Sequence, residues 1–298
     1  NLGGIFIKSS PILMTIERQL GNMLSSKFLH IEGKTMKDIF DLKGRVAIVT
    51  GGSRGIGKMI ATEFVKRGVR VYITARKAAP CLATAEELSQ LGECIALPHN
   101  LAKNEDLDAF VDEVKNREDK LDILINNAGA AWAEPLDTFS EEGWDRVMDL
   151  NVKSLFFVTQ QLLPLLRVNA DNEDPSRIIN VGSIDGINTP VFETYPYGPS
   201  KAAVHHLTRV LSAKLVKEDI IVNAIAPGPF PSNMLGPAVG HDYSGIAKAN
   251  PRSRVGTPED IAGLTIFLCS RAGAFTVGET ITCDGGLVAR SGHDLSGG

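Results

Sequence analysis

The sequence predicts an α/β protein built on a parallel sheet with helices on both faces. From Lys43 onward, short apolar segments alternate with longer segments whose apolar residues recur every three or four positions. Strands that are apolar along their whole length are typical of a sheet covered on both sides. A chain of 298 residues, 43% hydrophobic and 22% charged, is long enough to bury one large core, so we expect a single domain.

The expected elements follow one another in a regular order. The first strand, residues 45–50, ends in glycines, and an apolar helical face at residues 56–67 stops at Gly68. Further strands are expected at residues 69–74, 94–97, 121–126, 177–181, 220–225 and 279–283, and further helices near residues 83–90, 104–117 and 141–166. This alternation of strand and helix predicts parallel pairing.

Residues 1–40 are expected to form an N-terminal extension, because their scattered apolar residues have no sustained period. Their apolar stretches are too short for a secretory signal. We interpret the segment as a docking or loosely held arm. An organellar import segment is the alternative, because the first 35 residues carry four bases against two acids, and the bases are Lys8, Arg18, Lys27 and Lys34.

Composition excludes several classes of protein. The net charge of −4 argues against a nucleic-acid partner, which would need a cationic face. No run of 18 apolar residues is present, so no membrane span is expected. The four cysteines, without CxxC or metal-ligand spacing, suggest buried thiols in a reducing compartment, and we expect a cytoplasmic protein without a bound metal; they are Cys81, Cys94, Cys269 and Cys283.

A glycine-rich turn follows the first expected strand, in the run Thr50-Gly51-Gly52-Ser53-Arg54-Gly55-Ile56-Gly57. Between a strand and a helix, such glycines let the backbone approach a pyrophosphate, which the helix N-terminus then binds. The second strand ends near Arg76 without an acidic residue, so Arg54 and Arg76 favour the 2′-phosphate of NADP(H) over NAD. Glycines also mark ordinary turns, and the two arginines could simply be solvated surface bases.

Tyr197 and Lys201 stand four residues apart before an apolar helical run, so both side chains can lie on one helix face. A tyrosine has an ordinary pKa of about 10, and a neighbouring cation that favours its phenolate would suit it to proton transfer with a carbonyl. Tyr195 has no such lysine partner, because the residue four positions after it is Pro199. On spacing alone, such a pair is more often structural.

Taken together, the motifs resemble the short-chain dehydrogenase/reductase family, in its NADP(H)-preferring branch. They come in the family's order between about residues 41 and 286: Thr50–Gly57, Asn126-Asn127-Ala128-Gly129, Asn151, Ser183, Tyr197 with Lys201, and Pro227-Gly228. The resemblance implies a Rossmann-type, doubly wound sheet of seven parallel strands, assembled as tetramers or dimers. It also implies that residues 41–298 form one cofactor-binding catalytic domain with a substrate loop near 229–256.

The resemblance assigns roles to individual residues. Tyr197 would exchange the proton with the substrate oxygen, Lys201 would bias that phenol and bind the nicotinamide ribose, and Ser183 would hold the carbonyl oxygen. Asn151 would help to hold a water relay to Lys201. The implied cofactor-binding residues are Gly51, Ser53, Arg54, Gly55, Ile56, Gly57, Arg76, Asn100, Leu101, Asn127, Ala128, Gly129, Tyr197, Lys201, Pro227, Gly228, Phe230 and Ser232. Without the family, Ser183 would be read as a turn cap and Asn151 as a satisfied helix residue.

The chain departs from the family pattern at two places. Asn100 replaces the usual aspartate beside the adenine, but its amide oxygen can still accept a hydrogen bond. Three prolines stiffen the segment 227–232, in which Ser232 keeps a hydroxyl for the cofactor. The loop that follows suits either a movable lid over an apolar substrate or an ordinary surface loop; its apolar residues are Phe230, Met234, Leu235 and Val239.

Two runs, Gln160-Gln161-Leu162-Leu163-Pro164-Leu165-Leu166-Arg167 and Tyr195-Pro196-Tyr197-Gly198-Pro199-Ser200-Lys201, resemble 3-oxoacyl thioester reductases most within the family, in particular those of the rhamnolipid pathway. We therefore expect an NADPH-dependent reductase that converts a 3-oxoacyl thioester to its 3-hydroxy product. A secondary alcohol dehydrogenase acting on a sugar, steroid or small ketone is the alternative, and a non-catalytic NADP-binding regulator is disfavoured by the retained tyrosine, lysine and serine.

Docking of an acidic acyl carrier protein needs basic residues near the cleft. Acidic residues stand where such bases would be expected, namely Asp171, Glu173, Asp174, Glu218 and Asp219. Arg167 and Arg177 are the bases that remain for this contact. The sequence thus leaves open whether the substrate is a carrier-protein thioester, a coenzyme A thioester or a free ketone.

Overall fold

A computed structural model describes residues 38–168, 170–190, 192–232 and 240–289. The chain divides between Ile39 and Phe40, and everything below concerns the second unit, Phe40–Gly298. Almost all of the expected N-terminal extension lies outside the described residues, as do Met234, Leu235 and Val239 of the expected substrate loop.

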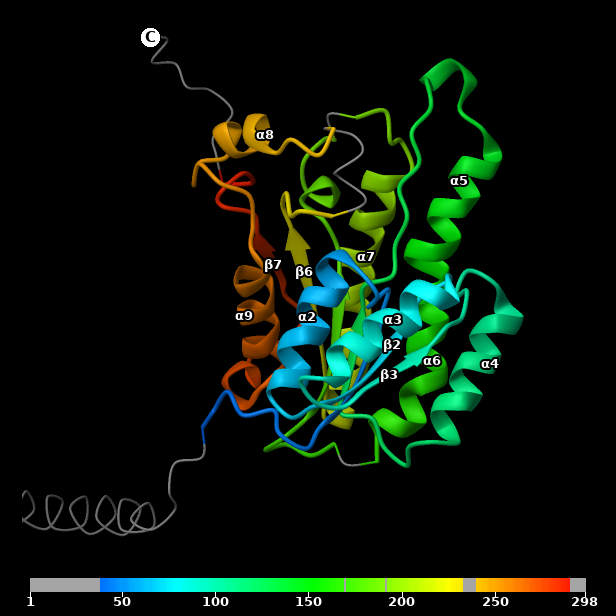
Figure 1. The fold of residues 1–298 in the computed structure, drawn as a ribbon, viewed down its shortest axis with the longest axis vertical. Coiled ribbons are helices and arrows are strands. Elements are labelled where there is room, and N and C mark those ends of the chain that lie inside the picture. The colour runs from blue at the N-terminus through cyan, green and yellow to red at the C-terminus, as the bar shows by residue number, and fades with distance from the viewer. Residues whose placement is uncertain (1–37, 169, 191, 233–239, 290–298) are drawn as a thin grey trace, which may run out of the picture. The chain divides into compact units, whose positions relative to one another are not determined.

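Seven parallel strands form one sheet in the order β3-β2-β1-β4-β5-β6-β7, which confirms the predicted doubly wound sheet (Figure 1). The chain builds outward from β1 to β3, then crosses back to place β4 on the other side of β1. The strands are β1 (Val46–Thr50), β2 (Arg70–Thr74), β3 (Cys94–Leu97), β4 (Ile123–Asn126), β5 (Ser176–Val181), β6 (Ile220–Pro227) and β7 (Thr280–Cys283). Ligands of such sheets bind where the direction reverses, here beyond the carboxyl ends of β1 and β4.

Helices cover both faces of the sheet. One layer contains α2 (Gly55–Lys66), α3 (Ala78–Ser89) and α9 (Pro258–Cys269), and the other contains α4 (Asn104–Lys115), α6 (Leu155–Leu166) and α7 (Tyr197–Leu215). Figure 1 also labels the short helices α5 (Glu141–Met148) and α8 (Ser244–Ala249). No helix among the described residues is long and apolar enough to cross a membrane.

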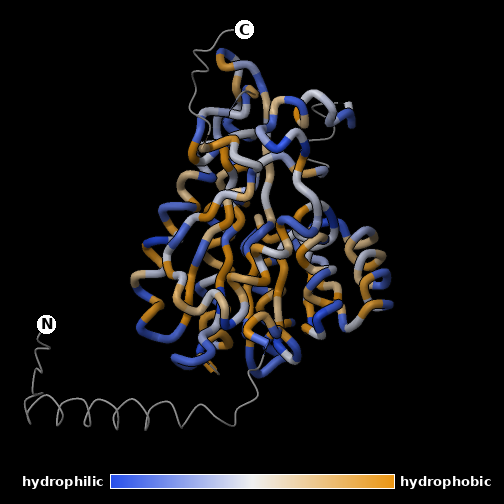
Figure 2. The backbone as a smooth tube through the Cα atoms, turned by 90° about the vertical axis from the view of Figure 1, so that its left-hand side faces the viewer, coloured by the Kyte–Doolittle hydropathy of each residue, from blue (hydrophilic) through white to orange (hydrophobic). Residues whose placement is uncertain are grey.

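The two helical layers enclose two separate cores because successive side chains of a strand point to opposite faces. In β1, Ala47 and Val49 pack with α2 and α9, whereas Val46 and Ile48 pack with α4 and α6. Figure 2 shows the resulting hydrophobic strands between helices that are hydrophilic on their outer sides. Burial of both faces explains why the strands are apolar throughout.

Two helices differ by more than two residues from their predicted boundaries. Helix α3 begins at Ala78, five residues before the expected start. Pro80 is tolerated in its first turn because a backbone N–H at that position has no partner within the helix. The expected helix at residues 141–166 is interrupted by a π-helical segment, Asp149–Ser154, between α5 and α6. Such segments are often found at functional sites, and this one contains Asn151.

Candidate active site

A cleft of about 1150 Å³ lies beyond the carboxyl ends of the strands. It is lined by all of the sequence-predicted site residues except Asn151 and Gly57. Gly57 lies below the cleft surface, where a Cβ atom would come within 2.4 Å of the Asn127 amide nitrogen and of the Gly51 carbonyl oxygen. The structure therefore brings together in one cavity residues that span positions 51 to 232.

The glycine-rich turn forms a cradle at the start of α2. Gly51 and Gly55 have φ angles of +66° and +53°, which L side chains rarely adopt. Arg54, the N-cap residue of α2, makes no side-chain cap, so the backbone N–H groups of the first turn have no side-chain acceptor there. A Gly-rich cradle with such donors fits a pyrophosphate.

Arg54 and Arg76 line the same end of the cleft as this cradle, together with Lys77. Within the described ranges, neither arginine forms an ion pair, so both guanidinium groups can donate hydrogen bonds to a bound anion. Asn100 also lines this end, and its Oδ1 accepts a hydrogen bond from the Ala102 N–H at 3.4 Å. The donor set fits a nucleotide with a 2′-phosphate.

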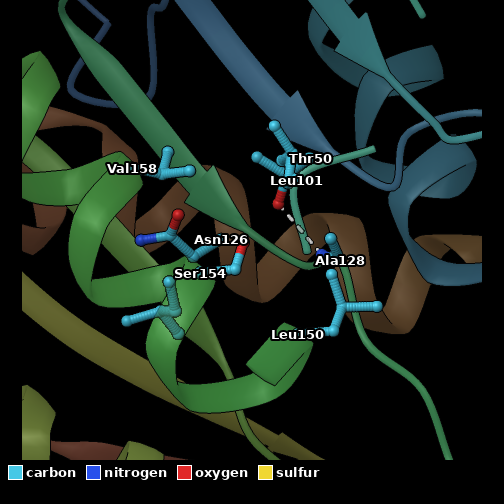
Figure 3. Close-up of a pocket in the computed structure, with 8 residues that line it drawn as sticks. Thr50, Leu101, Asn126, Ala128, Leu150, Ser154 and Val158 are labelled. Carbon is cyan, nitrogen blue, oxygen red and sulfur yellow. Dashed lines mark hydrogen bonds between the residues drawn. The ribbon is translucent and has the colours of Figure 1, made fainter. Parts of the chain in front are cut away.

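Thr50 fixes the segment after β4 against the glycine turn. Its Oγ1 accepts hydrogen bonds from the backbone N–H groups of Asn127 and Ala128, each at 2.9 Å, and Asn127 Nδ2 donates to the Thr50 carbonyl oxygen at 2.8 Å. Figure 3 shows Thr50 and Ala128 beside a small internal cavity of about 10 Å³, near the minimum for one water molecule. The carboxyl ends of β1 and β4 are therefore held in a fixed relation.

A buried chain of polar side chains lies beneath the cleft. Asn126 Nδ2 donates to Thr159 Oγ1 and to Asn180 Oδ1, and Asn180 Nδ2 donates to Thr208 Oγ1, each at 2.9 Å. These contacts join α6, β4, β5 and α7. Because a buried polar group without a partner is costly, the chain fixes how these four elements pack.

Asn151 does not line the cleft but lies directly behind its wall. Its Oδ1 accepts from the Ala130 N–H at 2.8 Å, and its Nδ2 donates to the Ala130 carbonyl oxygen at 3.0 Å and to Ser200 Oγ at 2.9 Å. A Cβ atom on Gly129 would lie 3.3 Å from Asn151 Oδ1 and 3.5 Å from Lys201 Nζ. Gly129 therefore leaves a narrow space shared by the asparagine and the lysine.

Tyr197 and Lys201 occupy the first two turns of α7 on one face, as their spacing predicts. Lys201 Nζ donates to the Val181 carbonyl oxygen at 2.8 Å and lies 5.7 Å from the centre of the Tyr197 ring. Burial lowers the pKa of the Lys201 ammonium to about 8. Its ammonium lies beside the Tyr197 ring.

Burial is also the largest influence on Tyr197, whose pKa it raises to about 12. A hydrogen bond with Ser183 lowers this pKa, and the negative charge of Asp185 raises it. Burial therefore outweighs the expected shift toward phenolate and keeps the phenol protonated. The protonated form is the one that donates a proton to a substrate oxygen.

Ser183 combines both interpretations given to it from sequence. Its Oγ accepts from the Asp185 N–H at 3.1 Å, which caps a short 3-10 helix at Ile184–Gly186. The same hydroxyl interacts with Tyr197 and lines the cleft. The cap fixes the serine where it can share a substrate oxygen with the tyrosine.

The structure corrects two expectations about basic residues. Arg177 is fully buried, and its guanidinium donates to the carbonyl oxygens of Pro175 and Ser270, so it is not accessible to a carrier protein. Arg167 is exposed, but its Nε pairs with Glu218 at 2.6 Å. The acid that stands where the family has a base thus neutralises the remaining arginine.

Phe230 packs into the core, which does not suit a residue of a movable lid. It is buried, and its ring lies against Gly256, where a Cβ atom would come within 2.3 Å. Phe230 therefore anchors the start of the expected substrate loop to the core. The four cysteines are unpaired, three of them buried, and no group of three metal-ligating side chains occurs among the described residues.

Several cleft residues were missed from sequence. Asp185, Trp132, Arg146 and Phe192 line the cleft, and buried His205 packs behind it against Gly182. Asp185 could have been noticed as an acid two residues after Ser183. The others depend on loop paths that residue patterns do not reveal.

Comparison with known proteins gives consistent results. Residues 51–288 match a family described as enoyl-(acyl carrier protein) reductase. The chain is 46% identical over 255 residues to the rhamnolipids biosynthesis 3-oxoacyl-(acyl-carrier-protein) reductase of Pseudomonas aeruginosa, covering 85% of this chain and 99% of that protein. It is 31% identical over 259 residues to 5-keto-D-gluconate 5-reductase of Escherichia coli, covering 85% and 99%.

Among solved structures, the Pseudomonas aeruginosa RhlG/NADP active-site complex matches with a TM-score of 0.81 and 45% sequence identity. The match covers 85% of this chain and 100% of that chain. The similarity therefore extends over the whole sheet and the cleft.

Proposed function

Because this chain belongs to the short-chain dehydrogenase/reductase family, we propose that it is an NADPH-dependent reductase of 3-oxoacyl thioesters, giving the 3-hydroxy product. The observation that carries the proposal is the convergence of Ser183, Tyr197 and Lys201 on one cleft whose other end carries Arg54 and Arg76. The relatives described above include a reductase named for a 3-oxoacyl substrate and a structure described as an NADP complex.

The cleft residues fit the cofactor. The Gly51–Gly57 turn and the N-terminus of α2 would hold the pyrophosphate, and Arg54 and Arg76 would hold the 2′-phosphate. Lys201 would bind the nicotinamide ribose, and the segment that Thr50 fixes, Asn127 and Ala128, would form the adjoining wall of that site. The bound cofactor supplies the hydride for the carbonyl carbon.

The side chains of the chain supply the rest of the chemistry. Ser183 and Tyr197 hydroxyls would both donate to the substrate carbonyl oxygen, which fixes that oxygen and polarises the carbonyl. As negative charge develops on the oxygen, Tyr197 transfers its proton there, and the buried Lys201 ammonium stabilises the phenolate that forms.

Asn151 acts by positioning its neighbours rather than by touching the substrate. Its side-chain amide already makes three hydrogen bonds, so it is a rigid part of the wall beside Gly129. We assign to it the support of a water relay that returns a proton to Tyr197 by way of Lys201. The space that Gly129 leaves open beside both side chains supports this role.

Initial rates of NADPH and NADH oxidation with a short 3-oxoacyl thioester test the proposal, with a simple ketone as control. Tyr197→Phe should lose about 100-fold or more in turnover while NADPH binding is retained. Tyr195→Phe is a matched control, since the Tyr195 hydroxyl contacts Glu193 at 3.2 Å and lies outside the cleft lining. Near-normal turnover of Tyr197→Phe would overturn the site assignment.

A second candidate is reduction of a polyhydroxylated keto acid or oxidation of a sugar alcohol. Asp185 lines the cleft beside Ser183, and within the described residues its carboxylate has no hydrogen-bond donor of its own. A carboxylate in this position suits a substrate hydroxyl better than an alkyl chain. Rates with 5-keto-D-gluconate beside the thioester separate the two candidates.

We also propose that the protein forms a homo-oligomer in the cytoplasm. Exposed apolar side chains on consecutive helices support assembly, among them Trp144, Phe157 and Val210 with exposed fractions of 43%, 38% and 46%. The buried, unpaired cysteines suit a reducing compartment. Light scattering after gel filtration gives the oligomer size, and a monomer at micromolar concentration would exclude the assembly.

A further inference from the structure

The two sides of the cleft next to the catalytic centre differ in polarity. On the side of β6 and β7, none of the described lining residues is charged; they are Pro227, Gly228, Pro229, Phe230, Ser232, Ile246 and Leu287. Ile246 lies on α8 and Leu287 lies in the turn after β7, and both residues are partly exposed. We call Ile246 and Leu287 the apolar wall, because their exposed surface suits an apolar part of a ligand.

The side of the cleft beyond β4 and β5 carries the charges. Its charged lining residues are Glu142, Arg146, Asp149 and Asp185. Phe192 belongs to this side as well, because the carbonyl oxygen of the next residue, Glu193, accepts a hydrogen bond from the Glu134 N–H at 3.3 Å. We call this side the charged wall.

The apolar wall lies within reach of the reacting centre. Strands β5, β6 and β7 are neighbours, with Val181 paired to Ile225 and Pro227 paired to Cys283. At about 4.8 Å between strands, the end of β7 lies about 10 Å from the end of β5, where Ser183 is found. At about 1.5 Å per bond, the carbons beyond the keto group of an eight-carbon 3-oxoacyl chain span about 6 Å. Contact with a side chain covers about 4 Å more, so such a chain can meet the wall.

A single buried amide connects the two parts of the apolar wall. Asn250, which follows α8, is 4% exposed, and its Nδ2 donates to the Asp284 carbonyl oxygen at 2.8 Å. Its backbone N–H donates to the Ile246 carbonyl oxygen at 3.1 Å, and its Oδ1 accepts from the Arg252 N–H at 2.8 Å. The amide therefore ties the helix that carries Ile246 to the turn that carries Leu287, above the ends of β6 and β7 (Figure 1).

The turn after β7 is itself fixed by Asp284. Its carboxylate accepts hydrogen bonds from the N–H groups of Gly286 at 2.8 Å and Val288 at 2.7 Å, the residues on either side of Leu287. A Cβ atom on Gly228 would come within 2.7 Å of Asp284 Cα, so the turn packs directly against the residue that follows β6. The position of Leu287 beside the cleft is therefore well defined.

Building on the proposed function, we infer that Ile246 and Leu287 bind the alkyl chain of the 3-oxoacyl group, and that Asn250 is the positioning residue that holds them together. An alkyl chain is stabilised by leaving water for an apolar surface, and the charged wall offers it less of such a surface. The thioester end of the substrate then faces the charged wall.

The test compares the N-acetylcysteamine thioesters of a 3-oxobutanoyl and a 3-oxooctanoyl group, which differ only in chain length. The measured quantity is the chain-length ratio, which is kcat/KM for the long chain divided by kcat/KM for the short chain. Leu287→Ala and Ile246→Ala should each lower this ratio about tenfold, mainly through KM, because the removed carbons no longer cover the alkyl chain. Leu91→Ala, a partly exposed leucine outside the cleft lining, is the matched control.

Phe192→Ala tests the direction of the chain inside the cleft. Because Phe192 lies on the charged wall, its loss should leave the chain-length ratio within about twofold. A larger fall of the ratio in Phe192→Ala than in Leu287→Ala would show that the chain lies on the other side, and would overturn the inference.

Asn250→Asp tests the positioning role with almost no change of shape. The new carboxylate has no proton to donate to the Asp284 carbonyl oxygen, so the chain-length ratio should fall about fivefold while the dissociation constant of NADPH stays within about twofold. A purely structural role would lower the melting temperature and leave the ratio unchanged. Asn116→Asp is the matched control, since Asn116 also follows a helix but is exposed and outside the cleft lining.

An unchanged chain-length ratio in Leu287→Ala or in Ile246→Ala would overturn the alkyl site. An unchanged ratio in Asn250→Asp would overturn its positioning role. Failure of the proposed function gives a different result, because the unmodified protein would then reduce neither thioester.

Discussion

Acidification from pH 7 to pH 4 should destabilise this protein through one buried side chain, His205. Its ring is 4% exposed and lies one turn after Lys201 in α7. The imidazole rests on bare backbone, since a Cβ atom on Gly182 would lie 2.0 Å from His205 Nε2. Among the described residues Nε2 has no hydrogen-bond partner, so the ring is buried in its neutral form.

The size of the effect follows from the pKa of His205 in the folded and unfolded states. Burial, then the positive charges of Lys201 and Arg209, lower the pKa of His205 from 6.5 to about 4, against an opposing hydrogen bond with the Gly186 backbone. Between pH 6.5 and pH 4, His205 takes up a proton in the unfolded chain but not yet in the folded one. The free energy of unfolding therefore falls as the pH falls. At about 1.4 kcal/mol per pH unit, the loss is about 3 kcal/mol.

Urea unfolding at pH 7, 5.5 and 4 measures this loss when the protein is compared with His205→Leu. The free-energy difference between the two should shift by about 3 kcal/mol in favour of the variant across this range, because every other titrating group is common to both. His206→Leu, on the exposed side of the same helix, is the control for replacing a helical histidine by leucine. A difference between the protein and His205→Leu that stays constant with pH would refute the reasoning.

Three further predictions concern activity. Arg76→Ala should lower kcat/KM with NADPH by about 10- to 100-fold and leave kcat/KM with NADH within about threefold of its original value. The ratio of the two kcat/KM values measures this change of preference. Asp185→Asn removes a charge that raises the pKa of Tyr197, so the pH profile of alcohol oxidation should move to lower pH; an unchanged profile would contradict this. Gly129→Ala places a methyl group 3.3 Å from Asn151 Oδ1 and should cost about tenfold in turnover at an unchanged melting temperature.

Strand positions and sheet type could be predicted because the physical signal is local. Ile48 and Val49 face different helical layers, so β1 must be apolar at every position, and that pattern is visible in the sequence. The site could be predicted for a related reason. Parallel strands end at the same edge of the sheet, so Gly51, Asn127 and Ser183 line one cleft there although more than 130 residues separate the first from the last.

The features that the sequence did not reveal depend on contacts between distant segments. Arg177 looks like a surface base in the sequence, but its guanidinium satisfies carbonyl oxygens of Pro175 and Ser270, the latter at the end of α9. The π-helical segment at Asn151 has the same apolar period as its flanks, so periodicity could not reveal it. Trp132 and Arg146 meet only because Gly143 leaves room for a ring from another part of the chain.

Helix α7 joins the chemistry of the site to the stability of the fold. Tyr197, Lys201 and His205 recur every four residues and therefore share one buried face. Lys201 donates to the Val181 carbonyl oxygen, and His205 packs against Gly182, so the helix holds the two residues that precede Ser183. The burial of this helix face, which brings Tyr197 and Lys201 close to Ser183, also lowers the pKa values of Lys201 and His205. The precision of the site is therefore obtained at the cost of stability in acid, where His205 must take up a proton that its position disfavours.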